Sequence, residues 1–363
     1  MRIVVKLGTY TLSAGGERLS HSRMVELVRQ VARLRNGGHE MLVVSSGAVF
    51  AGREILGPPS IRKDISFKQV LAAAGQVRLM GLYEEFFSLH QVPVAQALLT
   101  RSDLADRERY LNARNTLLSL LQLGVVPIIN ENDVVAIEEI KIGDNDNLSA
   151  LVANLIDADL LIILTDQAGL FTADPRVDAE AKLIPEVTVI DERVRNLAGK
   201  RGSRLATGGM VTKIQAAELA IRSGTEVRIA SGAEADVLLR IVAGESVGTR
   251  FSTAVSKIES RKRWILAEPA RGDVYLDEGA VKALLGDGKS LLPVGVTGLQ
   301  GEFERGQTVR LLSPLKDEVA RGITNYDATD LKSILGHHSN EIARILGYHY
   351  GPAVVHRNNM VVV

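Results

Sequence analysis

Six short runs of apolar residues constrain the fold of this 363-residue chain more than any other feature. They are rich in Val, Ile and Leu, and they cover residues 3–7, 41–44, 92–98, 125–129, 160–164 and 227–230. Unbroken apolar runs of this length are typical of strands buried on both faces, as in a parallel sheet covered by helices on each side. They therefore predict a central, mainly parallel sheet.

Helical periodicity fills the intervals between these runs. The clearest example repeats apolar residues at three- and four-residue spacing: Met24, Leu27, Val28, Val31 and Leu34. Gly37-Gly38 follows, where glycine readily takes the left-handed conformation that ends a helix. Similar stretches lie at 112–123, 147–156 and 213–221. Strands that alternate with helices predict an α/β fold, a three-layer α/β/α sandwich.

The composition changes after about residue 256. Residues 257–271 carry five Lys or Arg against two Asp or Glu and include Pro269, which predicts a linker. Beyond it, short strand-like pieces at 274–276, 308–312 and 353–356 alternate with glycine turns. We therefore expect a first domain at 1–256, a linker at 257–271 and a small β-rich domain at 272–363.

Several classes of protein are disfavoured by the bulk composition. The chain has no cysteine, which excludes disulfides, thiolate zinc sites and a cysteine nucleophile, and which fits a reducing compartment. The 43 Lys and Arg balance 43 Asp and Glu, so no global field attracts nucleic acid or an anionic membrane. Lys6 interrupts the N-terminus too early for a signal peptide, and no apolar run could span a bilayer. We expect a cytoplasmic protein with no membrane contact.

Polar residues follow four of the predicted strands, where each strand ends. These groups are Lys6-Leu7-Gly8-Thr9, Ser45-Ser46-Gly47-Ala48, Asn130-Glu131-Asn132-Asp133 and Thr165-Asp166. Ligands of open parallel sheets bind outside the carboxyl ends of the strands, and glycine lets backbone N–H groups approach a phosphate. Each group alone is compatible with an ordinary strand end or helix cap. Their coincidence at successive strands favours a phosphate-handling site.

Two further motifs each precede a predicted helix. Gly143-Asp144-Asn145-Asp146-Asn147 is either a turn with an Asn cap or a cluster that organises magnesium or active-site lysines and holds an amino acid. Thr207-Gly208-Gly209-Met210-Val211-Thr212-Lys213 combines glycines, hydroxyls and a lysine, as phosphate cradles do. Neither motif has the Walker A spacing G-x-x-x-x-G-K-[ST]. Gly288-Lys289-Ser290 matches only the end of that motif, because its first glycine would fall at position 283, which is Ala283.

Together these groups, with Gly169-Leu170-Phe171-Thr172-Ala173-Asp174-Pro175, resemble the motifs of the amino acid kinase family. The stretches 288–293, 301–303 and 305–306 are similar to a PUA domain. The resemblance implies the amino acid kinase fold followed by a PUA domain. It also implies ATP-dependent phosphorylation of the γ-carboxylate of L-glutamate to γ-glutamyl phosphate, the first step of proline biosynthesis, with feedback inhibition by proline.

The resemblance also implies roles for individual residues. The catalytic residues would be Lys6, Lys213 and Asp146, and the glutamate-binding residues Ser46, Asp133 and Asn145. The ATP-binding residues would be Lys6, Gly8, Thr165, Asp166, Thr207, Gly208, Gly209, Met210, Val211, Thr212 and Lys213. Mg²⁺ would bridge the ATP oxygens, with no metal ligand assigned to the protein. Tyr10 and Ser45 depart from the family pattern, in which serine and threonine are common at these positions.

The implied reaction needs no general base, because a carboxylate with a pKa of ~4.3 is already ionised at neutral pH. Implied partners are further copies of the chain, in a dimer or tetramer, and the next enzyme of the proline pathway. Two alternatives stay open: a sibling kinase for aspartate, N-acetylglutamate, carbamate or a nucleotide, and an RNA-binding protein, since PUA domains elsewhere bind RNA. Residues 272–363 carry nine Lys or Arg against eleven Asp or Glu, a net charge of −2 that disfavours RNA.

Overall fold

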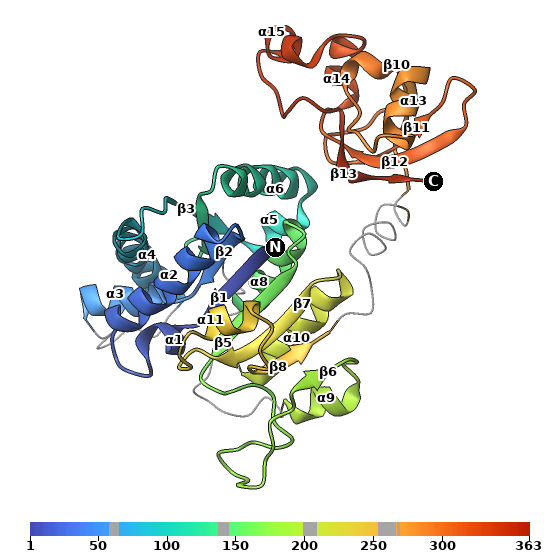
Figure 1. Cartoon of the computed structure of the whole chain (residues 1–363). Coiled ribbons are helices and arrows are strands. Elements are labelled where there is room, and N and C mark those ends of the chain that lie inside the picture. Colours follow the sequence, from blue (N-terminus) through green and yellow to red (C-terminus); the bar gives the residue numbers. More distant parts are fainter. Residues whose placement is uncertain (58–64, 137–144, 199–208, 253–265, 267–268) are drawn as a thin grey trace. The chain divides into compact units, whose positions relative to one another are not determined.

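The structure is a computed structural model that describes residues 1–57, 65–136, 145–198, 209–252, 266 and 269–363. Its residues form two compact units (Figure 1). The first contains Met1–Leu104 and Ala113–Ser256, and the second contains Ala105–Asn112 and Lys257–Val363. Each unit has its own sheet and its own hydrophobic core.

The first unit is built on an eight-stranded sheet in the order β3-β4-β2-β1-β5-β7-β8-β6. The strands are β1 (Arg2–Leu7), β2 (Glu40–Ser45), β3 (Val94–Leu99), β4 (Val126–Glu131), β5 (Leu160–Thr165), β6 (Glu186–Val187), β7 (Glu226–Ser231) and β8 (Thr249–Phe251). Neighbouring strands pair in parallel, except that β7 and β8 are antiparallel. All six predicted runs lie in or overlap strands, so the mainly parallel sheet is confirmed.

Helices cover both faces of this sheet (Figure 1). The helices before the linker are α1 (Thr9–Ser13), α2 (His21–Asn36), α3 (Ala48–Leu56), α4 (Ile65–Ser88), α5 (Arg101–Ala105), α6 (Arg107–Gln122), α8 (Asn145–Leu155), α9 (Glu192–Leu197), α10 (Met210–Arg222) and α11 (Val237–Val242), of which α6 belongs to the second unit up to Asn112. Alternate residues of β1, Ile3 and Val5, share a core with α2, α3, α4 and α11, while α8 also packs on β1 and α10 packs on β7. The three-layer sandwich is confirmed.

The four predicted helices correspond to α2, α6, α8 and α10, although their starts differ. Ser20 caps α2, because its side chain accepts a hydrogen bond from the Arg23 N–H. Helix α6 begins at Arg107, five residues before the predicted start at 112, and the Asp106 carboxylate accepts from the Arg109 N–H at this end. The periodicity of apolar residues does not register such polar first turns.

The second unit has a five-stranded sheet in the order β10-β9-β11-β12-β13. Its elements are β9 (Gly272–Leu276), α13 (Glu278–Leu285), β10 (Val296–Gln300), β11 (Thr308–Leu312), β12 (Glu318–Thr324), α14 (Ala328–Ile334), α15 (Ile342–Leu346) and β13 (Val355–Val362). A β-rich C-terminal unit is therefore confirmed. The predicted piece at 353–356 is displaced: Ala353 and Val354 precede β13, and the Val354 N–H donates to the Leu291 carbonyl instead.

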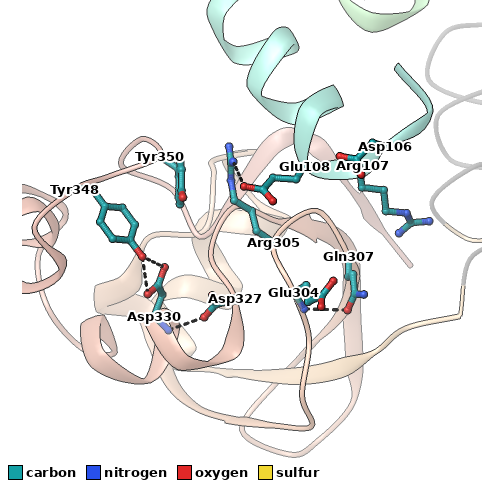
Figure 2. A pocket seen from close by; sticks show the side chains of 10 residues that line it. All are labelled: Asp106, Arg107, Glu108, Glu304, Arg305, Gln307, Asp327, Asp330, Tyr348 and Tyr350. Atoms are coloured by element: carbon teal, nitrogen blue, oxygen red, sulfur yellow. Dashed lines mark hydrogen bonds and ion pairs between the residues drawn. The ribbon is translucent and has the colours of Figure 1, made fainter. Parts of the chain in front are cut away.

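Figure 2 shows a pocket of about 480 Å³ that is lined by residues of the second unit. Its lining is Asp106, Arg107, Glu108, Glu304, Arg305, Gln307, Asp327, Asp330, Tyr348 and Tyr350. The Arg305 guanidinium lies 3.7 Å from the centre of the Tyr350 ring, and the Tyr348 hydroxyl donates to Asp330 at 2.8 Å.

Among the described helices of the chain, none is long and apolar enough to cross a membrane.

Candidate active site

A buried carboxylate lies between two buried lysines in the first unit. Lys6, near the end of β1, places its ammonium 2.7 Å from Asp146 Oδ1, and Lys213, in the first turn of α10, lies 3.3 Å from Asp146 Oδ2. Lys6 is only 7% exposed, Lys213 6% and Asp146 1%. Charged groups are rarely buried this deeply without a partner or a function. Two ammonium groups that converge on one point suit a ligand with negative charge.

The protonation states in this cluster follow from burial and from the neighbouring charges. Burial raises the pKa of Asp146, but the attraction of Lys6 and Lys213 and the hydrogen bond from Thr212 outweigh it and lower the pKa to about 2. Burial lowers the pKa of Lys213, while Asp146 opposes the shift. Asp146 is therefore a carboxylate at neutral pH, which suits it to hold the lysines and not to accept a proton.

The turn after β1 leaves little room around Lys6. A Cβ added at Gly8 would lie 3.3 Å from the Lys6 ammonium, so a side chain here would crowd it. Strand β5 pairs with β1 and ends close by, where the Thr165 hydroxyl donates to the Asp166 carboxylate at 2.8 Å. The structure thus brings Lys6, Gly8 and the Thr165-Asp166 pair to neighbouring strand ends, as the sequence predicted.

Helix α10 presents its N-terminus at this cluster. Gly209 caps the helix without a side-chain hydrogen bond, and a Cβ added there would meet no atom of the described residues within 4 Å. The Thr212 hydroxyl donates to Asp146 at 2.7 Å, which ties the first turn to the carboxylate. The free N–H groups of a helix N-terminus favour an anion, so this end suits a phosphate together with the lysines. Thr207 and Gly208 lie outside the described residues.

A second cluster joins the ends of β2 and β4 to the start of α8. The Asn145 side-chain amide donates to Ser46 Oγ at 2.9 Å, to the Ser45 carbonyl at 3.2 Å and to Asn130 Oδ1 at 2.9 Å. The Asn130 amide in turn donates to Gln76 Oε1 at 2.8 Å. Ser46 and Asn145 therefore lie together, as predicted. Gln76, on α4, was not predicted, because a lone glutamine in a helix has no motif around it.

Asp133 lies in the turn that follows β4, three residues beyond Asn130. Burial raises the pKa of its carboxylate to about 6. Among the residues that the structure describes, no hydrogen bond or ion pair joins Asp133 to Ser46 or Asn145. A half-buried carboxylate with a raised pKa is relieved by a cationic ligand, because an ammonium favours its charged form. Gly143 and Asp144, which precede Asn145, lie outside the described residues.

The two departures from the family pattern differ in their surroundings. Tyr10 is 58% exposed in α1. Ser45 is fully buried, and its hydroxyl donates to the Ser46 carbonyl and lies 2.7 Å from the Tyr83 hydroxyl. Since the Ser45 proton is used, Tyr83 is the donor in the second bond. The Ser45 hydroxyl thus bonds within the end of β2 and to α4. Tyr83 is a further α4 residue that was not predicted from the sequence.

The sequence of this chain matches known proteins. A model described as the amino acid kinase family matches residues 1–231, and a model of the PUA domain matches residues 272–346. A protein of Herpetosiphon aurantiacus named glutamate 5-kinase is 57% identical over 362 residues, which cover 99% of this chain and 98% of that protein. The glutamate 5-kinase of Deinococcus radiodurans is 53% identical over 363 residues and is matched over the whole of both chains. That of Shewanella amazonensis is 56% identical over 363 residues, or 96% of its length.

Proposed function

This chain belongs to the amino acid kinase family, and we propose that it transfers the γ-phosphoryl group of ATP to the γ-carboxylate of L-glutamate. The products are ADP and γ-glutamyl phosphate, in the first step of proline biosynthesis. The proposal is supported by relatives named glutamate 5-kinase that match nearly the whole chain. The observation that carries it is the buried cluster in which Asp146 holds Lys6 and Lys213 within 2.7 and 3.3 Å.

The cluster suits phosphoryl transfer to a carboxylate. Glutamate is ionised at neutral pH, with a side-chain pKa of ~4.3, so no protein base is needed. Catalysis then consists of placing donor and acceptor in line and stabilising the charge of the transferring group. Lys6 and Lys213 would supply that charge. Asp146 would orient both lysines, because a carboxylate with its pKa at about 2 remains charged throughout.

The two clusters suggest where each substrate binds. ATP would occupy the side formed by Lys6, Gly8, Thr165, Asp166 and the loop and first turn at 207–213. Glutamate would bind at Ser46, Asp133 and Asn145, where Asp133 offers a carboxylate to the α-ammonium. We assign ATP and glutamate to these two sides because of their chemistry. The N-terminus of α10 favours an anion, whereas the end of β4 presents polar side chains and a carboxylate.

We propose that Mg²⁺ binds together with the nucleotide and not at a site formed by the protein alone. Among the described residues no three acidic or imidazole side chains form a metal site, and Asp146 is already paired with two lysines. The described residues therefore do not form a magnesium site by themselves. Bound with ATP, Mg²⁺ would neutralise charge on the phosphates.

The proposal is tested by incubating the chain with ATP, Mg²⁺, hydroxylamine and one candidate acceptor at a time. Hydroxylamine traps an acyl phosphate, and we expect the hydroxamate to form with glutamate. Aspartate, N-acetylglutamate and carbamate serve as the alternative acceptors. Rapid turnover with one of these, and none with glutamate, would refute the assignment of the substrate.

The role of Lys213 is tested by Lys213→Ala. We expect kcat to fall by about 10²- to 10³-fold, as for the loss of one group that stabilises developing charge, while the KM for glutamate changes little. Lys282→Ala, at an exposed position of α13, is the control and should keep wild-type kcat. An unchanged kcat for Lys213→Ala would show that Lys213 does not act on the phosphoryl group.

A further inference from the structure

We propose that Gln76, on helix α4, is a positioning residue of the glutamate site. Through Asn130 it fixes the orientation of the Asn145 amide, so that Asn145 Oδ1 accepts a hydrogen bond from the α-ammonium of the substrate. We call Gln76, Asn130 and Asn145 the amide relay. The inference rests on the proposed function, because it takes glutamate as the ligand.

The direction of each hydrogen bond in the amide relay is set by the backbone. The Glu131 N–H can only donate, and it donates to the Asn130 side chain at 2.9 Å, so the atom it meets is the oxygen Oδ1. The other end of Asn130 is then the amide nitrogen, which donates at 2.8 Å and makes its partner on Gln76 the oxygen Oε1. The chemistry of the neighbours thus decides which end of each amide is oxygen.

The same reasoning continues to Asn145. Its nitrogen faces Asn130 Oδ1 at 2.9 Å and the Ser45 carbonyl at 3.2 Å, and both of these oxygens can only accept. The two N–H bonds of Asn145 are therefore used, with Ser46 Oγ as a third acceptor at 2.9 Å. Asn145 has no N–H left for a substrate carboxylate, so it offers a ligand only its oxygen.

That oxygen needs a donor. Asn145 is 8% exposed, and its Oδ1 has no hydrogen-bond partner among the described residues. A buried acceptor without a partner is costly, and an ammonium carries three N–H donors. Glutamate presents one ammonium and two carboxylates, and the relay therefore selects the α-ammonium as the group that meets Asn145.

Gln76 holds the far end of the amide relay. It is 9% exposed, and its Oε1 gives the Asn130 nitrogen the acceptor that this buried group requires. Without it, the Asn130 side chain is held only at its oxygen, by the Glu131 N–H and by the Asn145 amide, and its nitrogen loses the bond to Gln76. Its side chain then gains freedom to rotate, and the acceptor that holds Asn145 is no longer fixed.

The test compares glutamate with glutarate, which lacks the α-ammonium, in the hydroxamate assay. For Gln76→Met we expect the KM for glutamate to rise and the preference for glutamate over glutarate, as a ratio of kcat/KM, to fall, each about tenfold. The KM for ATP should stay within about twofold. Gln76→Glu keeps an oxygen facing the Asn130 nitrogen and should restore most of the preference.

Gln30→Met is the matched control. Gln30 is another buried glutamine of the first unit, 1% exposed in α2, and its Oε1 accepts from the Leu238 N–H at 2.8 Å. It should lose stability without any change in preference. The preference is a ratio measured on one preparation, so it does not depend on the fraction of folded enzyme. If Gln76→Met does not fold, Gln76→Lys, which presents a donor to Asn130, should show the same loss.

The possible results separate the two proposals. If the wild-type chain does not phosphorylate glutamate, the proposed function fails. If it does, and Gln76→Met or Gln76→Lys lowers activity on glutamate and glutarate by the same factor, the amide relay does not position the ammonium acceptor. A loss of preference in Gln30→Met equal to that in Gln76→Met would overturn the inference in the same way.

Discussion

At the scale of single residues, the raised pKa of Asp133 predicts how glutamate binding depends on pH. Burial places this pKa at about 6 in the free protein. The charged form attracts the α-ammonium, so protonation below pH 6 should weaken binding. We expect kcat/KM for glutamate to fall by up to about tenfold per pH unit below this value, since kcat/KM reports groups of the free enzyme.

The measurement is kcat/KM for glutamate between pH 5 and 8, with Asp133→Asn as the comparison. The variant should be poor at every pH and should lack the decrease around pH 6. The side chain of glutamate titrates at ~4.3, well below this range, so it does not mimic the effect. A variant that retains the same decrease would show that another group causes it.

The pKa of Asp146 is lowered, in contrast to that of Asp133, and this predicts how the stability of the fold depends on pH. Its pKa of about 2 in the folded chain is below the ~3.9 of an unfolded aspartate, so its contribution is complete above about pH 4 and is lost as pH falls from 4 to 2. Asp146→Asn leaves two buried lysines without their carboxylate. We expect the free energy of unfolding at pH 7 to fall by about 3–5 kcal/mol, measured by urea denaturation.

The control for Asp146 is Asp174→Asn, an exposed aspartate whose side chain pairs with Arg176 at 2.8 Å. An exposed pair contributes little, so this variant should unfold close to wild type at pH 7. Equal unfolding of Asp146→Asn and the wild-type chain would contradict the argument that the carboxylate stabilises the lysine pair.

At the scale of elements, α3 and α4 meet through two glycines. A Cβ at Gly52 would lie 1.9 Å from the Leu71 carbonyl oxygen, and one at Gly75 would lie 1.8 Å from the Ala48 carbonyl oxygen. Gly52→Ala and Gly75→Ala should therefore force the helices apart and lower the free energy of unfolding by about 1–3 kcal/mol or more. Because α3 follows Ser46 and α4 carries Gln76, the KM for glutamate should rise as well.

Gly81 provides a control within α4 itself. A Cβ there would meet no atom within 4 Å in the part of the chain that the structure describes, and the position is exposed. Since alanine is the better helix former, Gly81→Ala should raise stability by about 0.5–1 kcal/mol and leave KM unchanged. If all three variants behaved alike in thermal unfolding, the close contact between α3 and α4 would not be what requires glycine.

The elements that sequence patterns predicted and missed differ in a physical way. Strands β1, β2 and β5 are buried on both faces, so continuous apolar runs identify them. Helix α4 has apolar residues on several faces, with Val70 and Val77 exposed and Leu71 buried, and so shows no single apolar stripe. In the site, motifs at strand ends predicted Lys6 and Ser46, and the motif before α8 predicted Asn145. Gln76 and Tyr83 lie on α4 and contact Asn130 and Ser45, and only tertiary structure brings them there.

At the scale of the whole molecule, charge limits what the second unit can bind. Its pocket has five carboxylates, Asp106, Glu108, Glu304, Asp327 and Asp330, against the two guanidinium groups of Arg107 and Arg305. This lining disfavours binding of a nucleic-acid phosphate backbone, in line with the net charge of residues 272–363.

Several predictions from the sequence stay predictions. They are feedback inhibition by proline, assembly into a dimer or tetramer, the next pathway enzyme as partner, a cytoplasmic location and the domain limits at 256 and 272.

Two separate cores predict two unfolding transitions. Leu27 belongs to the core of the first unit and Leu331 to that of the second, and they are 1% and 0% exposed. Each substitution to alanine should cost about 2–5 kcal/mol and lower only the transition of its own unit in differential scanning calorimetry. ATP with Mg²⁺ should raise only the transition that Leu27→Ala lowers, because the proposed nucleotide site lies wholly in the first unit. A single transition, lowered by both substitutions and raised by the nucleotide, would mean that the two cores unfold as one cooperative structure.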